Sequence, residues 1–182
     1  MLRFYQVTMD SSDAIYFPDH PEFQPNLTPR QIFEQGAFGG TYFRAIHSQI
    51  TGKDYDNLQW QEFPFLRDLD PKLLNKSMSE FDVNINKYGV KSGTTLQYWE
   101  EKGWIVEQDP YGWVQWYCRF WMGRRSDDDA RQIKRWLNFA GPNGRFRKQL
   151  QNAVNAAGTT NFDSSIKPVV RQGLHQWAFE LR

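Results

Sequence analysis

Residues 109–149 read DPYGWVQWYCRFWMGRRSDDDARQIKRWLNFAGPNGRFRKQ. This stretch holds four of the eight tryptophans and the single cysteine of the 182-residue chain. Its apolar residues recur every three or four positions, which is the spacing of amphipathic helices, and glycines separate the runs. We therefore predict an aromatic helix, a basic helix and, after a glycine turn, a second basic helix, and we expect the rest of the chain to be organised around them.

The first of these helices is predicted to be central and buried. Asp109 is a favourable N-cap, and Pro110 is favourable at the first position of a helix. The apolar residues at helical spacing are Trp113, Trp116, Tyr117 and Phe120. Because the opposite face is also largely apolar, both faces should be covered by other parts of the chain. Cys118 lies on that opposite face, where a thiol is normally inert.

The two basic helices predict a phosphate-binding face. Ser126 is the expected cap of the first, and residues 141–144, GPNG, form a turn that leads into the second, in the manner of a helix-turn-helix pair. The unpaired amides at a helix start, the helix dipole and the adjacent cations all attract phosphate. The predicted nucleic-acid-binding residues are Arg124, Arg125, Arg131, Lys134, Arg135, Gly141, Gly144, Arg145, Arg147 and Lys148. The alternative is that GPNG is an ordinary turn between bundle helices.

Positive charge is concentrated in the same stretch. The net charge of the chain is only +1, but residues 1–118 carry 10 Lys and Arg against 16 Asp and Glu, whereas residues 119–148 carry nine against three. One basic segment in a nearly neutral protein favours a localised anionic partner, and we expect DNA or RNA. The alternative is that the acidic front half neutralises the basic segment through internal ion pairs. Tryptophans at helical spacing are likewise more often core residues than base-stacking residues.

The first part of the chain is predicted to be rich in loops. Residues 3–9 contain many β-forming residues and indicate one strand, whereas the prolines of residues 10–29 indicate an extended loop. Thr28 and Gln31 form a capping box that begins a short helix. Gly36 is expected to end this helix.

The middle of the chain shows few regular signals. The pair Gly39 and Gly40 indicates a tight turn or a close approach of two backbones. Residues 50–90 lack periodicity and are predicted to be mostly loop, with one short helix near residues 71–76. A second capping box at Thr94 is expected to open a further helix.

The predicted fold is mainly α (α+β). The length of the chain fits a single domain over residues 1–182. Residues 93–182 are expected to form a C-terminal helical bundle. The loop-rich N-terminal half, residues 1–92, with its few short strands, is expected to be wrapped on this bundle.

Several functional classes lack their sequence signal. A single cysteine excludes an internal disulfide and a zinc site with several cysteines. There is no Walker loop, no dinucleotide fingerprint and no nucleophile elbow, and the three histidines have no metal-ligand spacing. We therefore expect no cofactor and no metal. No apolar run approaches the roughly 20 residues that span a bilayer, and no signal peptide begins the chain, so we expect a soluble, cytoplasmic protein without a membrane partner.

A short motif supports an enzymatic alternative. Residues 108–111, QDPY, resemble the water-activating motif of uracil-DNA glycosylases, although Glu107 stands where that family has glycine and Gly112 where it has histidine. In that family the aspartate positions water and the tyrosine excludes larger bases, which implies a base flipped out of the stack. The alternative function is thus a DNA base-processing hydrolase with an aromatic pocket. Its candidate catalytic residues are Asp109, Tyr111, Arg44, His47 and His20.

Four longer segments carry a second resemblance. They are YFPDHPEFQPNLTPRQIF, FGGTYFRAIHSQITGKDY, DPYGWVQWYCRFWMGRR and RQIKRWLNFAGPNGRF. Together they are similar to a family of proteins found in microbes, algae, fungi, large DNA viruses and phages. The resemblance covers most of the chain and implies an intracellular protein of a kind that viruses can carry. It implies no established activity, so the leading hypothesis, a nucleic-acid-binding protein, rests on the basic helices.

Overall fold

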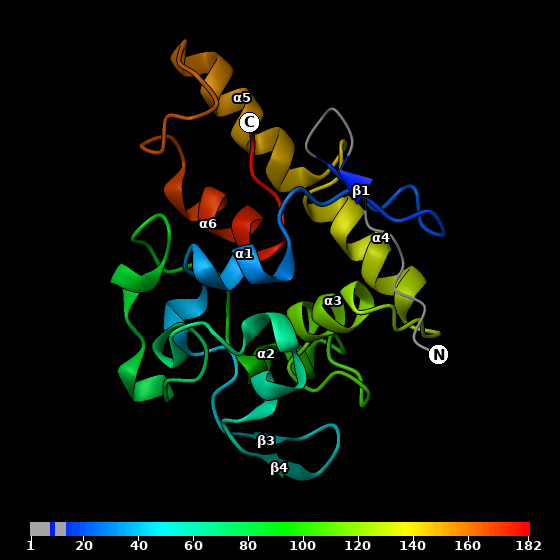
Figure 1. Ribbon diagram of the computed structural model, residues 1–182. Helices are drawn as coiled ribbons and strands as arrows, with labels where there is room; N and C mark the ends of the chain where they lie inside the picture. The colour runs from blue at the N-terminus through cyan, green and yellow to red at the C-terminus, as the bar shows by residue number, and fades with distance from the viewer. Residues whose placement is uncertain (1–7, 10–13) are drawn as a thin grey trace.

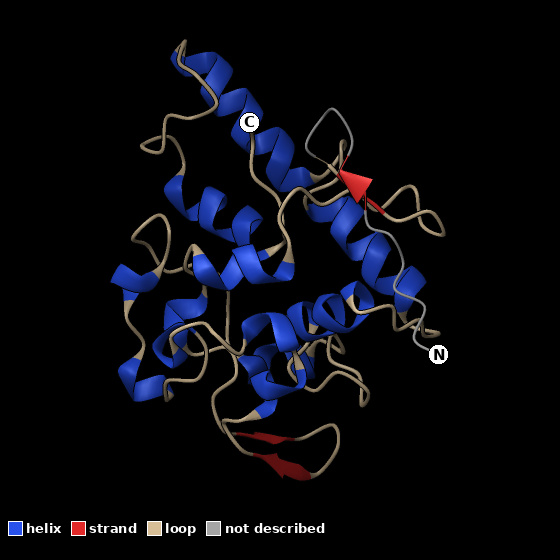
Figure 2. Cartoon of the chain, viewed as in Figure 1, coloured by secondary structure: helices blue, strands red, loops and turns tan. Residues whose placement is uncertain are grey.

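The computed structural model describes residues 8–9 and 14–182, so most of the strand predicted over residues 3–9 lies outside the described part. The described residues are mainly α-helical, as predicted (Figures 1 and 2). The helices are α1 (Pro29–Glu34), α2 (Leu96–Glu101), α3 (Trp113–Trp121), α4 (Asp129–Phe139), α5 (Arg145–Ala157) and α6 (Pro168–Gln176). Two small antiparallel sheets pair β1 (Thr8–Met9) with β2 (Ile15–Tyr16), and β3 (Ile46–Ser48) with β4 (Lys53–Tyr55).

The front half is rich in loops and short 3₁₀ helices. These helices are η1 (Phe38–Gly40), η2 (Gln59–Glu62), η3 (Pro64–Leu66), η4 (Pro71–Leu73), η5 (Met78–Glu80) and η6 (Val83–Ile85). The short helix predicted near residues 71–76 corresponds to η4. The capping box at Thr28 and Gln31 is confirmed, because the Thr28 hydroxyl accepts from the Gln31 amide and the Gln31 side chain accepts from the Thr28 amide.

Helix α3 is the centre of the core, as its aromatic spacing predicts. Trp116, Tyr117 and Phe120 are fully buried. Burial raises the pKa of the Cys118 thiol well above its usual value, which keeps this thiol protonated. A continuous cluster of buried hydrophobic residues joins both halves of the chain from Ile15 onward. The assignment of residues 1–182 to one domain stays a prediction, since residues 1–7 and 10–13 are not described.

The prediction that Asp109 caps α3 is wrong. The helix begins four residues later, after Gly112, whose positive φ of 87° directs the chain into the first turn. The cap comes instead from a distant residue. The Tyr42 hydroxyl accepts from the backbone N–H of Gln115 at 3.0 Å and donates to the backbone carbonyl of Tyr111 at 2.7 Å. A helix start whose cap lies about 70 residues away leaves no local capping pattern in the sequence.

The observed starts of α2 and α4 differ slightly from the caps predicted at Thr94 and Ser126. Helix α2 is capped by Thr95, which accepts from the Tyr98 amide at 3.2 Å, one residue later than expected. At the start of α4, Ser126 is a donor rather than a cap, because its amide and its hydroxyl both donate to the Asp129 carboxylate at 2.9 Å. Thr95 thus takes the capping position that was expected for Thr94. At α4 the Asp129 carboxylate holds the start of the helix in place of a Ser126 cap.

The close backbone approach predicted at Gly39 and Gly40 is confirmed. A Cβ atom on Gly40 would lie 2.1 Å from the Lys72 carbonyl oxygen, and φ at Gly40 is +79°. Gly36, which ends α1, packs equally tightly, because a Cβ there would lie 1.8 Å from the Ile85 carbonyl oxygen. These contacts bring η4 and η6 against the segment that follows α1.

The C-terminal segment after α6 ties the two halves together through Glu180. Its carboxylate pairs with Lys87, accepts from the Tyr88 hydroxyl and lies 3.5 Å from Nδ1 of the buried His175. The other ring nitrogen of His175, Nε2, donates to the Ile32 carbonyl at 3.0 Å. Burial alone would raise the pKa of Glu180, but the His175 ring and the Lys87 ammonium outweigh it and lower the pKa to about 2.

This arrangement predicts acid-sensitive stability. The folded-state pKa of Glu180 lies below the unfolded value of about 4.3, so the carboxylate contributes stability that is complete above that pH and is lost as the pH falls toward 2. Glu180→Gln should therefore lower the free energy of unfolding by ~3 kcal/mol at pH 7, and by about half as much at pH 3. Urea unfolding at both pH values measures this difference. The exposed Glu107→Gln is the control, and a Glu180→Gln deficit of equal size at both pH values would contradict the account.

Candidate functional site

Three of the predicted phosphate-binding arginines are held in ion pairs within the protein. Both terminal guanidinium nitrogens of Arg124 donate to the Asp109 carboxylate, at 2.9 and 2.5 Å. Arg125 pairs with Asp19, and Arg131 with Asp128. The alternative of neutralisation by the acidic front half therefore holds for Arg124 and Arg125, whereas Arg131 is paired within its own segment. We do not assign them to a phosphate-binding face.

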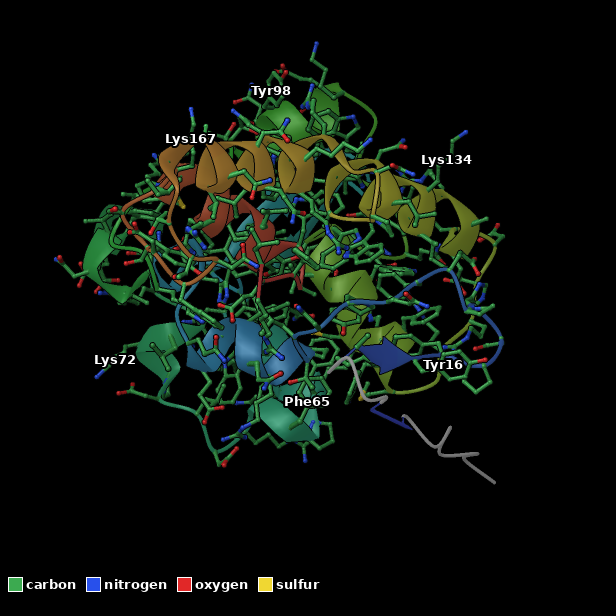
Figure 3. All side chains as sticks on the ribbon, turned by 90° about the horizontal axis from the view of Figure 1, so that it is seen from above. Tyr16, Phe65, Lys72, Tyr98, Lys134 and Lys167 are labelled. Carbon is green, nitrogen blue, oxygen red and sulfur yellow. The ribbon has the colours of Figure 1, made fainter. Side chains whose placement is uncertain are left out.

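The remaining predicted cations lie on α4 and on the first turns of α5. Lys134 is exposed on α4, and Figure 3 shows its side chain pointing away from the molecule. Arg145 and Lys148 are exposed on α5. Arg147 is half-buried, with its guanidinium 4.5 Å from the centre of the Phe179 ring. The exposed positive charge of this region is thus smaller than the sequence count indicates.

The GPNG turn is built for tight packing. Gly141 and Gly144 are both buried. A Cβ atom on Gly141 would lie 2.7 Å from a backbone atom at the end of α4, and one on Gly144 would lie 2.6 Å from another. Only Pro142 and Asn143 are exposed at the tip of this turn. Helices α4 and α5 follow one another along one side of the molecule, joined at the turn (Figures 1 and 3). The two glycines therefore shape the turn, and we do not assign them to a ligand.

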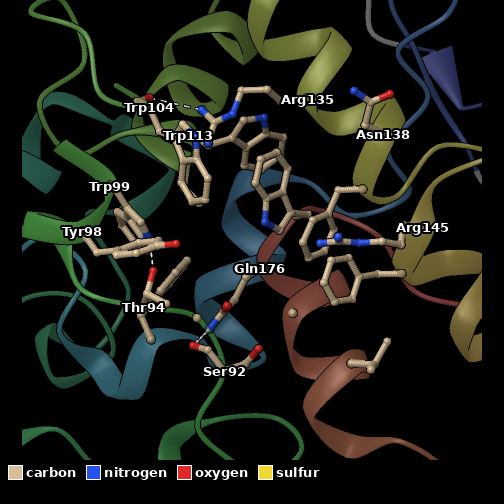
Figure 4. Close-up of a pocket in the computed structure, with 18 of the residues that line it drawn as sticks. Ser92, Thr94, Tyr98, Trp99, Trp104, Trp113, Arg135, Asn138, Arg145 and Gln176 are labelled. Atoms are coloured by element: carbon tan, nitrogen blue, oxygen red, sulfur yellow. Dashed lines mark hydrogen bonds between the residues drawn. The ribbon is translucent and has the colours of Figure 1, made fainter. Parts of the chain in front are cut away.

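A groove of about 930 Å³ opens beside this turn (Figure 4). One wall comes from α2 and the loop that follows it, and the other from the end of α4, the start of α5 and α6. The floor is formed by the start of α3 together with Tyr42 and Ile105. A volume of this size lies in the range of small-molecule and cofactor sites, about 300–1,000 Å³.

One wall of the groove is a ladder of stacked aromatic rings. The ring centres of Phe146 and Phe139 are 4.0 Å apart, and those of Phe139 and Trp177 are 4.9 Å apart. Trp177 continues onto Trp113 at 4.8 Å, which leads into the core. Because the inner end of the ladder is fixed by the core, the outer rings are held in place for stacking with a ligand.

The opposite wall also presents aromatic side chains. Tyr98 and Trp104 are each 39% exposed, and their rings meet edge to face with centres 5.7 Å apart. Trp99, between them in sequence, donates its indole N–H to the Thr94 hydroxyl at 2.7 Å. Neighbouring exposed aromatic residues along a groove are typical of a binding surface.

The charged groups of the groove are two arginines. The Arg135 guanidinium lies 5.5 Å from the centre of the Trp104 ring and 5.3 Å from that of Trp177, and it donates to the Trp104 carbonyl. Burial, followed by the nearby Arg131, lowers the pKa of Arg135 to about 10, so it stays charged at neutral pH. The Arg145 guanidinium lies 4.7 Å from the Phe146 ring centre. Among the described residues no Asp or Glu lines the groove, which therefore favours an anionic ligand.

The floor carries a hydrogen-bond donor without an acceptor. Trp113 is 6% exposed and lines the groove, and its Nε1–H has no hydrogen-bond partner in the described part of the chain. Buried indole N–H groups normally find a partner, because leaving a donor unpaired costs free energy. Because this nitrogen is shielded from solvent, a ligand in the groove does not reach it in this structure.

The candidate catalytic residues of the glycosylase alternative do not form a pocket. Asp109 is fully buried between Arg119 and Arg124 and does not line the groove. The Tyr111 hydroxyl is occupied, since it donates to the Arg44 carbonyl at 2.7 Å.

The remaining candidates of that alternative lie elsewhere. His47 is exposed on β3 and pairs with Asp54 at 2.7 Å. His20 lies 3.5 Å from Glu22 in the loop before α1. Neither histidine is bonded to Asp109 in the described structure, so we do not place catalysis at these residues.

Other signals are equally limited. Within the described ranges no group of three His, Cys, Asp or Glu side chains is placed to hold a metal ion. None of the described helices is long and apolar enough to cross a membrane.

Comparison with protein-family models, with curated proteins and with solved structures found no match. The family resemblance and the QDPY likeness therefore stay predictions.

Most of the groove was not predicted from the sequence. Of the predicted residues only Arg135 and Arg145 line it. The missed residues include Tyr98, Trp99, Trp104, Phe139, Asn138, Asn143 and Trp177. One signal was available: aromatic residues 98 and 99 lie in a short helix, and aromatic residue 104 follows it, among charged neighbours and a glycine, where a large core is not expected.

Proposed function

We propose that the groove binds single-stranded nucleic acid, with a base stacked against its aromatic walls and a phosphate paired with its arginines. The observation that carries the proposal is the presence of two aromatic walls and two arginines in one groove whose described lining residues include no carboxylate. Proteins that bind single strands combine these features, because bases stack on aromatic rings and the phosphate backbone follows positive charge. The nucleic-acid partner expected from the sequence is kept, but its site moves from the helix faces to the groove.

The shape of the site favours a single strand over a duplex. In a duplex the faces of the bases are covered by their neighbours, and a protein reaches only their edges. The rings of Tyr98, Trp104 and Phe146 offer faces and edges inside a groove, which an unstacked base can enter. Lys134 on α4 and Lys148 on α5 lie outside the groove lining and extend the positive charge for flanking phosphates.

The same groove favours binding rather than hydrolysis. General acid–base catalysis needs a titratable group within hydrogen-bond reach of the reacting atom. The described lining residues include no histidine, cysteine or carboxylate, and their titratable side chains are those of Arg135, Arg145, Tyr42 and Tyr98. The function that fits is therefore recognition of a strand without chemical change.

Binding should be weakened by removing one ring or one charge from the groove. We expect Trp104→Ala to lower the affinity for a fluorescein-labelled single-stranded oligonucleotide by about 10- to 100-fold, which corresponds to one lost stacking contact of ~1–3 kcal/mol. Arg145→Ala should reduce the slope of log affinity against log salt concentration by about 0.7, the value for one phosphate contact on a single strand. Fluorescence anisotropy at several salt concentrations measures both.

Matched controls lie elsewhere on the surface. Phe162 is 77% exposed and lies outside the groove, so Phe162→Ala removes an exposed ring without touching the site. Arg67→Ala removes an exposed arginine that donates to the Gln61 carbonyl, also outside the groove. Equal losses of affinity in the groove variants and their controls, or no binding by the wild type, would rule out the proposed function.

A further inference from the structure

We propose that Asp128, although it lies outside the groove, is a positioning residue of the binding site, because it orients both the Arg135 guanidinium and the loop that carries Trp104. This inference rests on the proposed function and adds to it a residue that sets the geometry of the site. Asp128 is 8% exposed at the start of α4 and does not line the groove. Its effect on a ligand therefore passes through the side chains that it holds.

The Asp128 carboxylate organises two side chains of α4. Arg131 donates to both of its oxygens, through Nε and Nη2, and the side-chain amide of Gln132 donates to Oδ2 at 2.9 Å. Gln132 is fully buried, and its Oε1 accepts from Nη1 of Arg135 at 2.9 Å. A carboxylate can only accept and a guanidinium can only donate, so Gln132 must turn its nitrogen to Asp128 and its oxygen to Arg135. The buried amide thus transmits the position of Asp128 to Arg135.

Both arginines converge on the backbone carbonyl of Trp104. Nη1 of Arg135 donates to this oxygen at 3.2 Å, a bond drawn in Figure 4, and the two terminal nitrogens of Arg131 donate to it at 3.4 and 3.5 Å. The Arg135 guanidinium also lies 5.5 Å from the centre of the Trp104 ring. Because Trp104 lies in the loop after α2, these bonds hold that wall of the groove against α4.

Arg135 keeps donors for a ligand. Its Nε and Nη2 make no hydrogen bond within the described chain, and neither atom is shielded from solvent. A guanidinium is a rigid fork, so fixing Nη1 on Trp104 and Gln132 also fixes the direction of the two remaining nitrogens. Donors that are oriented before a phosphate arrives bind it at a lower cost in ordering.

The two possible roles of Asp128 predict opposite effects of its removal. If Asp128 acted only as a negative charge near a site for an anion, its removal would strengthen binding. If it positions the site, its removal weakens binding, since Arg131 and Gln132 lose the acceptor that orients them. Asp128→Asn separates the two roles, because it removes the charge and keeps the shape but places an amide N–H against other donors.

The test compares the affinities of the wild type, Asp128→Asn and Asp127→Asn for labelled oligo(dT) by fluorescence anisotropy. Asp127 is the matched control, because it is exposed, is the neighbour of Asp128 in sequence and loses the same charge. We expect Asp128→Asn to weaken binding by about 5- to 10-fold, less than Trp104→Ala, since the ring is displaced rather than removed. Asp127→Asn should bind as tightly as the wild type or slightly more tightly.

A double variant shows through which residue Asp128 acts. Asp128→Asn combined with Trp104→Ala should bind more tightly than the product of the two single losses predicts, because both changes affect the same contact. A general loss of stability gives additive effects instead, so this comparison separates positioning from a purely structural role.

The indole N–H spectrum of the ligand-free protein tests the same network without any oligonucleotide. In Asp128→Asn the Trp104 signal should move, while the signal of Trp60, outside the groove, should stay in place and show that the fold is kept. Where Asp128→Asn does not fold, Arg131→Met removes one of the two residues that donate to the Trp104 carbonyl and leaves Asp128 intact. It should weaken binding without changing the salt slope, because Arg131 does not line the groove.

The possible results separate this inference from the proposed function. Binding by Asp128→Asn that equals or exceeds that of Asp127→Asn, or additive losses in the double variant, would overturn the positioning role and leave the groove as a binding site. An unchanged Trp104 signal in ligand-free Asp128→Asn would overturn that role as well, whether or not an oligonucleotide binds. Absence of binding by the wild type to every oligonucleotide would overturn the proposed function itself.

Discussion

Asp109→Asn is expected to lower the free energy of unfolding by about 3–5 kcal/mol, as does the removal of one partner from a buried ion pair. The Asp109 carboxylate is fully buried, and Arg119 and Arg124 both donate to it. Arg119 keeps a second partner in Glu62, but Arg124 loses the only carboxylate that it contacts in the described chain. A neutral amide cannot satisfy both guanidinium groups, so their desolvation is no longer offset.

Urea unfolding at pH 7 measures this effect. Asp127→Asn is the matched control, because Asp127 is exposed in the same region and should change stability by no more than about 0.5 kcal/mol. A small effect at Asp109 would mean that its carboxylate is dispensable for folding. The account of the ion pairs would then be wrong, and a role for Asp109 in catalysis would be open again.

Trp116→Ala is expected to destabilise the protein by ~3–5 kcal/mol, because it empties a large volume in the centre of the core. Trp116 is fully buried on α3, its ring lies 4.9 Å from that of Phe120, and its indole N–H donates to Asp129 at 2.8 Å. The loss is a large part of a typical stability of ~5–15 kcal/mol. Thermal and urea unfolding measure it.

Trp104→Ala, a tryptophan-to-alanine change in the groove, should have the opposite profile to Trp116→Ala. Trp104 is 39% exposed, so Trp104→Ala should leave the unfolding free energy within ~1 kcal/mol of the wild type while it weakens binding. The two variants separate the tryptophans of the core from those of the site. A Trp116→Ala protein that is as stable as the wild type but has lost binding would show that this assignment is reversed.

The sequence predicts well those parts of the fold that depend on neighbours along the chain. The 3.6-residue spacing of apolar residues locates α3 and α4, and the capping box at Thr28 is complete within four residues. The start of α3 was mispredicted because its cap is the hydroxyl of Tyr42, from a distant part of the chain. Nothing in the local sequence around Asp109 shows that two arginines hold its carboxylate.

The site is less predictable for the same reason. Charge counts identify a basic segment, but they do not show that Arg124 and Arg125 are paired with Asp109 and Asp19. The groove combines side chains from α2, α3, α4, α5 and α6, and no spacing within one segment brings them together. Its assembly depends on tertiary packing, which a single sequence does not reveal.

The tryptophans allow a direct test of the central claim, that the aromatic groove binds single-stranded nucleic acid. Four of the eight line the groove: Trp99, Trp104, Trp113 and Trp177. The other four lie outside it: Trp60, Trp116, Trp121 and Trp136. Each indole N–H gives its own signal in a proton–nitrogen correlation spectrum, so a titration with oligo(dT) reports on site and control residues in one sample.

We predict that the signal of Trp104 shifts most, because its side chain is 39% exposed in the groove. The signals of Trp60 and Trp121 should stay in place. Shifts at Trp60 or Trp121 with the groove signals unchanged, or a spectrum that does not respond to the oligonucleotide, would contradict the account.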